Sequence, residues 1–219
     1  MATMSATAFA QSEEWAVQAM KKYKEKDYGA CADLFERSFA EKSQYFVDDM
    51  TLERNLYSAS CCLALAGRGE AAAARLEKAI ENPAFVGYDH MMKDQDLTVL
   101  HNSQNWEFVL KAAKAAMQAR SPITYPSLDR ESAKKNPPLF PREAMKADAS
   151  GIVVLVVTVG ADASPKKILI EQSSGDELLD SAAAETAKTW QYRPGVAKDG
   201  TRFSGRVRVP IEFRRNRKF

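Results

Sequence analysis

The feature that most constrains the fold is a change of hydrophobic period partway along the 219-residue chain. From Ser12 to Arg120 apolar residues recur at helical spacing, which predicts helices. Beyond a proline-containing stretch the pattern changes to β-branched runs and alternation, which predicts strands. A chain of this length can close two small cores. We expect an all-α domain at residues 13–120, a linker at 121–136 and an α+β domain at 137–219, with residues 1–12 a leader remnant or a disordered start.

The balance of charge excludes two broad classes of partner. The 31 basic and 29 acidic side chains nearly cancel, so no overall field attracts nucleic acid or an acidic membrane surface. The basic cluster from Arg214 to Lys218 is interpreted as a solvated chain end. Even the apolar run from Gly151 to Gly160 is half the roughly 20 residues that a membrane-spanning helix needs. We expect neither a nucleic-acid partner nor a membrane span in this chain.

Two segments of the N-terminal half share one spacing of small and bulky residues. Each segment lies on a predicted helix, and turns at residues 26–29 and 66–69 separate these helices from the ones before them. Small side chains let two helices approach, and a bulky one fills the gap between them. The pattern resembles the tetratricopeptide (TPR) family and predicts TPR-like helical hairpins. The residues that carry it are Cys31, Phe35 and Ser38, then Ala72, Leu76 and Ala79.

The C-terminal half predicts three strands and one helix. The run from Ile152 to Val159 and the segment from Lys166 to Gln172 flank a polar turn, which indicates an antiparallel hairpin. Residues 178–190 place apolar side chains on one face, as in a helix packed on a sheet. Arg206 to Phe213 alternates basic and apolar side chains, which predicts a strand with one solvated face. The expected fold is a three-stranded antiparallel sheet with a packed helix.

Several short motifs in this half resemble the TonB C-terminal domain family over about residues 137–213. They are an entry sequence with two prolines and an aromatic residue, a glycine opening the first strand, a Ser-Gly turn, a helix start, an aromatic-rich segment and a valine-proline-isoleucine run. In this chain they read Pro138-Leu139-Phe140-Pro141, Gly151, Ser173-Ser174-Gly175, Leu179-Asp180 with Ala182-Ala183, Trp190-Gln191-Tyr192-Arg193-Pro194 and Val209-Pro210-Ile211-Glu212-Phe213.

The last strand is the expected binding site. Pro210 cannot donate to a sheet ladder, so this strand should lie at an edge or carry its proline on the unpaired side. The resemblance implies the same place, because TonB-like domains add an extended peptide of an outer-membrane receptor beside the last strand. The candidate peptide-binding residues, in one of two registers, are Arg206, Val207, Arg208 and Val209. Large aromatic residues are expected in the structural core instead: Phe140, Trp190, Tyr192 and Phe213.

Two departures from the family leave two functions open. Members that drive receptors begin with an inner-membrane helix and often continue through a proline-rich spacer, and neither is in this sequence. Pro137 replaces the polar amide that precedes the entry motif in well-known transducers. Our first hypothesis is a periplasmic adaptor that binds proteins through its TPR-like surface and its sheet edge, with a homodimer left open. The alternative is a component of TonB-dependent transport across the outer membrane, its membrane anchor removed or supplied by another protein.

The first residues and the cysteines bear on the cellular location. Ala8-Phe9-Ala10 is similar to the end of a secretory leader whose basic start and apolar middle are missing. We therefore expect an exported, periplasmic protein with a truncated leader, and a short disordered start of a cytosolic protein is the alternative. In an oxidising compartment Cys31 could pair with Cys61 or Cys62, whereas buried unpaired thiols are the favoured alternative.

No arrangement typical of an enzyme is present in the sequence. His90 and His101 do not have metal-ligand spacing, and no Gly-x-Ser-x-Gly elbow presents a nucleophilic serine. Asp94 and Asp96 begin like a calcium loop, but Thr98 occupies the third ligand position and the required glycine and glutamate are missing. We therefore expect no catalysis, no cofactor and no metal.

Overall fold

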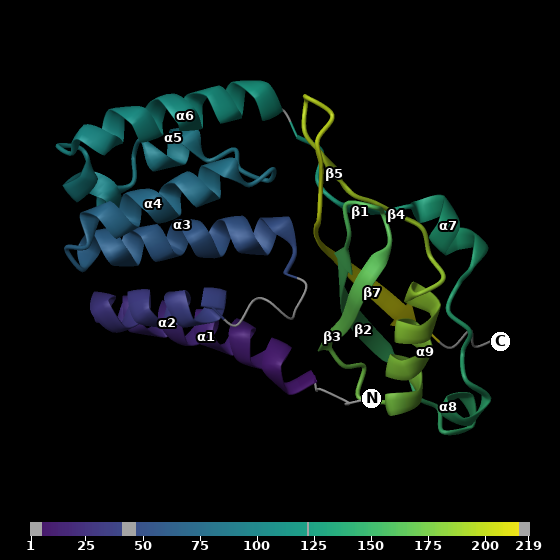
Figure 1. Ribbon diagram of the computed structural model, residues 1–219. Coiled ribbons are helices and arrows are strands. Elements are labelled where there is room, and N and C mark those ends of the chain that lie inside the picture. Colours follow the sequence, from purple (N-terminus) through teal and green to yellow (C-terminus); the bar gives the residue numbers. More distant parts are fainter. Residues whose placement is uncertain (1–5, 41–46, 122, 215–219) are drawn as a thin grey trace, which may run out of the picture. The chain divides into compact units, whose positions relative to one another are not determined.

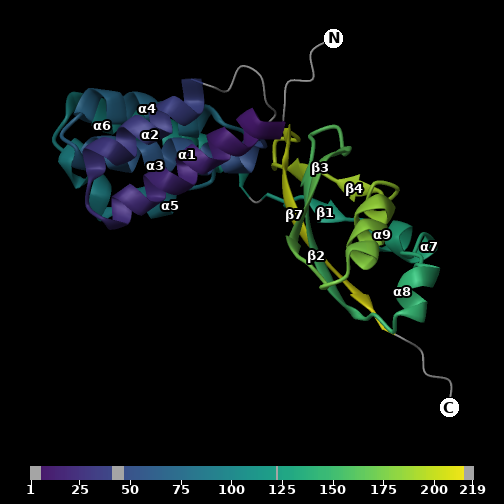
Figure 2. The ribbon, with the colours of Figure 1, turned by 90° about the horizontal axis from the view of Figure 1, so that it is seen from below.

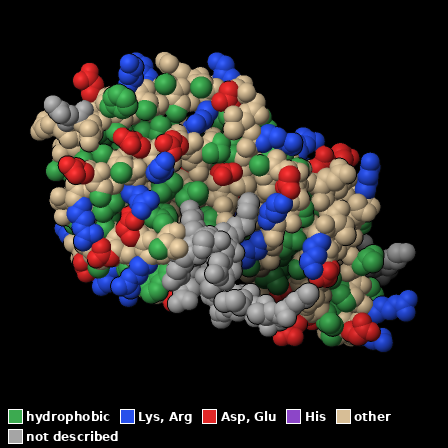
Figure 3. All heavy atoms as spheres, in the orientation of Figure 1, with side chains coloured by type: hydrophobic (Ala, Val, Ile, Leu, Met, Phe, Trp, Pro, Cys, Tyr) green, Lys and Arg blue, Asp and Glu red, His purple; other side chains and the backbone are tan. Residues whose placement is uncertain are grey.

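A computed structural model describes residues 6–40, 47–121 and 123–214 of the chain. Contacts divide it into two compact units (Figure 1). The helical unit contains residues 1–122 with 197–199, and the C-terminal unit contains the rest. Each unit has its own cluster of buried apolar side chains. On the face drawn in Figure 3, basic and acidic side chains are interspersed, as the nearly equal numbers of the two charges predict.

The helical unit is built from helices joined by short turns, as the hydrophobic period predicts. The predicted turns are confirmed, because α2 begins at Tyr28 and α4 at Gly69. Helix α1 packs against α2, α3 packs against α4, and α2 also contacts α3, so two helical hairpins follow in series. The bounds are α1 Ala6–Lys24, α2 Tyr28–Ala40, α3 Asp49–Leu65, α4 Gly69–Glu81, α5 Tyr88–Met91, the 3-10 helix η2 Gln95–Leu100 and α6 Gln104–Arg120.

Local hydrogen bonds explain where α3 begins and ends. The Asp48 carboxylate accepts a hydrogen bond from the backbone N–H of Thr51 at 2.9 Å, which satisfies one of the amides left unpaired at a helix start. After the helix, Gly67 has a φ of 76°, a left-handed conformation that glycine adopts without a steric cost. The N–H of Arg68 then donates to the carbonyl of Leu63 at 2.8 Å. This closing bond fixes the turn into α4.

The repeated small and bulky residues lie in the core between the helices. All of them are buried, so the shared spacing marks equivalent faces of α2 and α4. Phe35 and Leu76 are almost fully buried and fill space that the small residues leave open. The six residues are Cys31, Phe35, Ser38, Ala72, Leu76 and Ala79.

A disulfide joins α2 to α3. It links Cys31 to Cys62, whose Cα atoms are 5.9 Å apart, and leaves Cys61 as a buried free thiol. The favoured expectation of unpaired thiols therefore fails for Cys31 and Cys62 and describes Cys61 alone. The physical reason is the close approach of the two helices over small side chains, which brings one cysteine of each hairpin to bonding distance.

The C-terminal unit is centred on a three-stranded antiparallel sheet with the order β3-β2-β7. Two short ladders accompany it, one of β1 with β4 and one of β5 with β6. The predicted order of strand, strand, helix and strand is present as β2, β3, α9 and β7. The bounds are β1 Ser127–Leu128, α7 Arg130–Lys135, α8 Arg142–Lys146, β2 Gly151–Val159, β3 Pro165–Gln172, α9 Glu177–Ala187, β4 Tyr192–Arg193, β5 Gly195–Val196, β6 Arg202–Phe203 and β7 Gly205–Phe213.

Helix α9 packs against the sheet and contributes Leu179, Ala183 and Ala187 to the core (Figure 2). Every second residue of β2 faces this core, as strand geometry requires. The alternation in β7 follows the same rule, with exposed residues in between. The buried cluster contains Val153, Leu155, Val157 and Val159 of β2, Leu179, Ala183 and Ala187 of α9, and Val209, Ile211 and Phe213 of β7.

Two of the family motifs meet where β2 begins and α9 begins. A Cβ added to Gly151 would fall 2.6 Å from the carbonyl oxygen of Ser174, so only glycine fits there. Asp180 accepts hydrogen bonds from the N–H of Ser174 at 2.8 Å and from its hydroxyl at 2.7 Å. Burial raises the pKa of Asp180, but hydrogen bonds from Ser173 and Ser174 outweigh it and hold this pKa below its usual value.

The segment expected to be a linker contains regular structure. Strand β1 pairs with β4, and α7 follows an N-cap formed by Asp129. The N–H of Asp129 donates to the carbonyl of Gln191 at 2.9 Å. Because the division of the chain falls at Pro122, residues 123–136 group with the C-terminal unit. Independent folding of the two units stays a prediction.

The predictions for the chain ends fall partly outside the described residues. Of the expected leader remnant, residues 1–5 are outside and residues 6–12 belong to α1. Of the basic tail, Arg215 to Lys218 are outside. Within the ranges that the structure describes, no helix combines the length and the apolar character needed to cross a membrane.

Candidate functional site

Strand β7, which carries the predicted peptide-binding residues, lies at an edge of the sheet. It pairs with β2 along its whole length, from Gly205 opposite Val159 to Phe213 opposite Gly151. The sheet order places no further strand beyond β7 in the described part of the chain. Arg206 and Val207 are partly exposed, Arg208 is exposed and Val209 is buried. The four residues are therefore consecutive positions of one edge strand and not a cluster of side chains on one face.

Pro210 distinguishes the two hydrogen-bonding sides of β7. It lies opposite Val154, and its ring nitrogen has no hydrogen to donate. In an antiparallel pair, residues alternate between hydrogen-bonded and non-hydrogen-bonded positions. A proline fits without loss only where the missing N–H would point away from the neighbour. Positions of the same parity as Pro210, including Arg208 and Glu212, then direct their backbone groups toward the open edge.

The two edges of the sheet differ in regularity. The pairing of β7 with β2 is unbroken over nine residues. The pairing of β3 with β2 has register shifts between Val154 and Leu155 and between Thr158 and Val159. Such irregularities disturb the spacing of backbone groups that an added strand needs, and they are a common protection of sheet edges. By this comparison β7 is the better template for strand addition.

An ion pair crosses the solvated face of the sheet. The Arg208 side chain of β7 donates to the Glu171 carboxylate of β3, passing over β2. Both side chains are largely exposed, so the pair contributes little to stability. The charge of Arg208 is balanced within the sheet. The backbone of β7 is therefore the more useful recognition element.

The predicted core aromatics belong to the same buried cluster as the core-facing residues of β7. Trp190 is 6% exposed, and its indole N–H donates to the carbonyl of Asn136 at 2.7 Å. The Tyr192 hydroxyl donates to the carbonyl of Ala187 at 2.8 Å, and burial raises the pKa of Tyr192 to about 12. Phe140 is partly buried and packs edge-on against Phe213, the last residue of β7. The entry motif thus packs against the end of β7.

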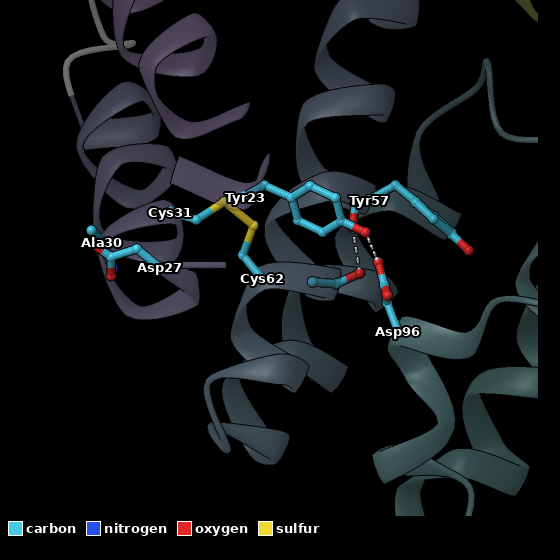
Figure 4. The surroundings of a disulfide bond; sticks show 8 residues. Tyr23, Asp27, Ala30, Cys31, Tyr57, Cys62 and Asp96 are labelled. Carbon is cyan, nitrogen blue, oxygen red and sulfur yellow. Dashed lines mark hydrogen bonds between the residues drawn. A yellow bond between two sulfur atoms is a disulfide. The ribbon is translucent and has the colours of Figure 1, made fainter. Parts of the chain in front are cut away.

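The helical unit also contains a polar cluster that was not predicted from the sequence. The Tyr23 hydroxyl of α1 donates to Asp96 at 2.5 Å, close to the disulfide (Figure 4). The Tyr57 hydroxyl of α3 donates to Asp94 at 2.9 Å. The hydrogen bond to Asp96, with burial and the charge of that carboxylate, raises the pKa of Tyr23 above its usual range. The pKa of Tyr57 is also raised above its usual range, chiefly by burial and further by the charge of Asp94.

The same cluster contains groups of the kinds that bind metal ions. The Sγ of Cys61 and carboxylate oxygens of Asp94 and Asp96 lie within 4.8 Å of one another. Burial, followed by the two carboxylates, raises the pKa of the Cys61 thiol above its usual range. A thiol must lose its proton to bind a metal. The described arrangement therefore fits a protonated thiol beside two carboxylates better than a metal centre.

The fold and this geometry define the C-terminal unit as a small α+β domain with one helix on an antiparallel sheet and a proline-containing edge strand. The family profile described as "Gram-negative bacterial TonB protein C-terminal" matches residues 136–214. This part of the chain is a TonB C-terminal domain, which confirms the resemblance carried by the motifs.

Curated relatives support this assignment. The chain is 37% identical over 90 residues to the protein TonB of Xanthomonas campestris pv. campestris, covering 41% of this chain and 40% of that protein. It is 40% identical over 79 residues to the protein tonB2 of Pseudomonas aeruginosa, covering 36% of this chain and 29% of that protein. The protein TonB of Vibrio cholerae is 34% identical over 77 residues, or 35% of this chain and 31% of that protein.

The comparisons are limited to part of each protein. The chain spans at most 40% of the length of these three relatives. No solved structure matches the chain.

Proposed function

We propose that the C-terminal unit binds an extended segment of an outer-membrane protein by adding it as a strand beside β7, as a non-catalytic component of TonB-dependent transport. The similarity to proteins named TonB supports transport over a general adaptor. The candidate contact residues are those predicted from the sequence: Arg206, Val207, Arg208 and Val209.

The position of β7 is the observation that carries the proposal. An edge strand with an unbroken ladder on one side offers evenly spaced N–H and C=O groups on the other. Backbone pairing provides affinity in strand addition, and pockets for alternate side chains provide selectivity. The sequence left open which residues of β7 direct their backbone groups away from β2. Pro210 indicates that these are the residues two positions apart from it, Arg208 and Glu212. The Arg208 amide is the donor that we expect a bound strand to use.

Substituting proline for Arg208 tests this expectation directly. Arg208→Pro removes an outward N–H and leaves the ladder to β2 intact, as Pro210 already does two residues on. We expect binding of a receptor-derived extended peptide to weaken at least about tenfold, since a lost backbone bond leaves its partner unsatisfied. Binding is followed by chemical-shift perturbation of the full chain, and folding by its thermal transition.

Arg208→Ala is the matched control. It removes the same side chain and its ion pair with Glu171 but keeps the amide. We expect it to bind the peptide nearly as the parent does. Equal affinity of folded Arg208→Pro and Arg208→Ala would contradict strand addition at this position. No binding by the parent at millimolar peptide would contradict it altogether.

The cellular location proposed is the periplasm. The disulfide between Cys31 and Cys62 supports it, because such bonds persist in oxidising compartments. An excess of this chain secreted into the periplasm of a Gram-negative host should compete for receptor segments and slow receptor-dependent uptake. The Arg208→Pro variant should not. Equal effects of both forms would argue against a role in transport.

The second candidate function is a periplasmic adaptor with a TPR-like binding surface. It is favoured by one observation, the equivalent buried faces of α2 and α4 in two consecutive hairpins. As an adaptor, the helical unit would bind one protein while the sheet edge binds another. Pairing of two copies of the chain through the sheet edge would give a homodimer. Equilibrium sedimentation of the parent and Arg208→Pro would distinguish a dimer formed through β7 from a monomer.

A further inference from the structure

The helical unit contains a solvent-open pocket of about 310 Å³ where α1, α3, α5 and η2 meet. This volume is near the lower limit for small-molecule sites and suits a single side chain. Its apolar surface comes from the rings of Tyr23 and Tyr57 and the thioether of Met20. Its carboxylates are those of Asp94 and Asp96. Aromatic faces beside carboxylates are the usual surroundings of a bound organic cation.

Neutral donors hold the two carboxylates in place. Besides the bonds from the tyrosine hydroxyls, the other oxygen of Asp94 accepts the N–H of Asp96 at 3.0 Å. Asp94 thereby caps η2 and has a fixed orientation. Both side chains are partly buried, so hydrogen bonds within the protein fix the orientation of their oxygens. A carboxylate still has room for further donors, since its two oxygens offer about four lone-pair sites.

The described lining of the pocket has no lysine or arginine to balance these carboxylates. His90 is the nearest cationic candidate, with its Nε2 at 3.6 Å from Asp94, and it is charged only when protonated. Other carboxylates of the same unit do have basic partners, such as Asp33 with Arg68 and Glu36 with Arg75. The pocket is therefore a partly desolvated site with a deficit of positive charge.

An ammonium or guanidinium group satisfies this site better than a metal ion. Its N–H groups can donate to carboxylate oxygens without displacing a proton from Cys61, which a thiolate-bound metal would require. Its apolar stem can lie along the tyrosine rings, as lysine and arginine stems do on apolar surfaces. A basic side chain therefore matches both the charge of the carboxylates and the shape of the pocket.

We propose that this pocket binds the cationic end of a lysine or arginine side chain presented by a partner polypeptide. The proposal goes beyond strand addition and does not depend on it, because the residues belong to the helical unit. It gives that unit a specific chemical preference: a segment with an exposed basic side chain and without acidic neighbours.

Short peptides test the preference on the full chain. The probe is acetyl-Gly-Ser-Lys-Ser-Gly-amide, titrated at pH 8, where histidines are ordinarily neutral, to about 10 mM, at which weak single-residue sites are populated. We expect amide shifts at Tyr23, Tyr57 and Asp96. An arginine peptide should act alike. Peptides with N-acetyl-lysine or glutamate at the centre should have no effect there.

Charge-removing variants provide the decisive comparison. The double variant Asp94→Asn with Asp96→Asn keeps acceptors for both tyrosines, and we expect it to bind the lysine peptide at least about tenfold more weakly. Asp89→Asn is the matched control, because Asp89 is an exposed acid of α5 that does not line the pocket. It should bind as the parent does. If the double variant does not fold, weaker binding of the parent at high salt provides the same test.

Three results would overturn the proposal. The first is the absence of shifts at the pocket with the lysine and arginine peptides. The second is equal binding of the glutamate and lysine peptides. The third is binding of zinc chloride at micromolar concentration by the parent that is lost in Cys61→Ala, with no effect of the lysine peptide, because this would identify the cluster as a metal site.

Discussion

The two units reach stable folds by different means. In the C-terminal unit, single residues have backbone roles that no other residue type can fill. Gly151 lies against the Ser174 carbonyl, and Pro210 marks the open side of β7. In the helical unit the recurring residues are selected by size, as with Phe35 and Leu76 between small neighbours. Size can be met by several residue types, whereas a backbone role cannot. A family is therefore recognisable in one unit and only an architecture in the other.

The largest effect is expected from removing the central aromatic of the C-terminal unit. Trp190→Ala should lower the free energy of unfolding of this unit by about 3–5 kcal/mol, because it deletes a buried ring that also bonds to Asn136. Denaturant unfolding followed by circular dichroism should then show the helical unit unfolding at its original midpoint. Trp190→Phe, which keeps most of the ring area, should cost less.

This variant also tests whether the units fold independently. Two separated transitions in Trp190→Ala are the expected result. One shared transition that moves as a whole would contradict independent units. A C-terminal transition unchanged from the parent would instead contradict the core position of Trp190.

The second prediction concerns opposite responses of the two units to pH. Burial raises the pKa of Glu53 in α3 to about 7, and Arg54 opposes this only in part. An unfolded glutamate titrates near 4.3. The stability contributed here is therefore present at low pH and is lost as the pH rises through about 7, by at most about 4 kcal/mol. For Asp180 the pKa is lowered, so its contribution is present above about pH 4 and is lost in acid.

Thermal unfolding between about pH 2 and pH 8 separates these contributions, because the Asp180 contribution is lost below about pH 4. Glu53→Gln should flatten the profile of the helical unit between pH 5 and pH 8 and leave the C-terminal unit unchanged. Asp180→Asn should reduce the acid sensitivity of the C-terminal unit. A Glu53→Gln profile parallel to that of the parent would show that this carboxyl titrates normally.

The smallest effects come from a matched pair of glycine substitutions. Gly151→Ala places a Cβ 2.6 Å from backbone, and we expect a loss of about 1–3 kcal/mol in the C-terminal unit. Gly29→Ala adds a Cβ with nothing within 4 Å inside α2, and we expect a gain of roughly 0.5–1 kcal/mol in the helical unit. Opposite signs in urea midpoints would support the contrast between the units. Equal losses would contradict it.

Much of the fold follows from local sequence patterns. The turns near Tyr28 and Gly69 and the succession of strand, strand, helix and strand could be predicted, because periodicity is a local signal. Pro210 predicted that the last strand lies at an edge or carries its proline on the unpaired side, and β7 lies at an edge. The short strand β1 and helix α7 could not, since they depend on pairing with β4, more than 60 residues away in sequence, for example Asp129 with Arg193. Proline content indicates where helices stop. It does not exclude a folded segment that is fixed by distant partners.

The pocket in the helical unit could not be predicted for the same reason. Tyr23 and Asp96 are 73 residues apart in the sequence. The local sequence around Asp94 and Asp96 does not match a calcium loop, because Thr98 occupies the third ligand position. Their partners come from α1 and α3, which only the packing of helices brings together. No spacing within one segment carries this information.

The disulfide between Cys31 and Cys62 has a consequence for how this protein would be handled. It closes a covalent ring around the connection between α2 and α3. A protease that cuts once inside the ring opens it but releases no fragment, and the chain migrates as a single species until a reductant is added. A sample that looks uncut on a non-reducing gel can thus already be nicked between its two hairpins. Paired reducing and non-reducing lanes would reveal such a nick, and cuts near residue 122 would give separate pieces in both.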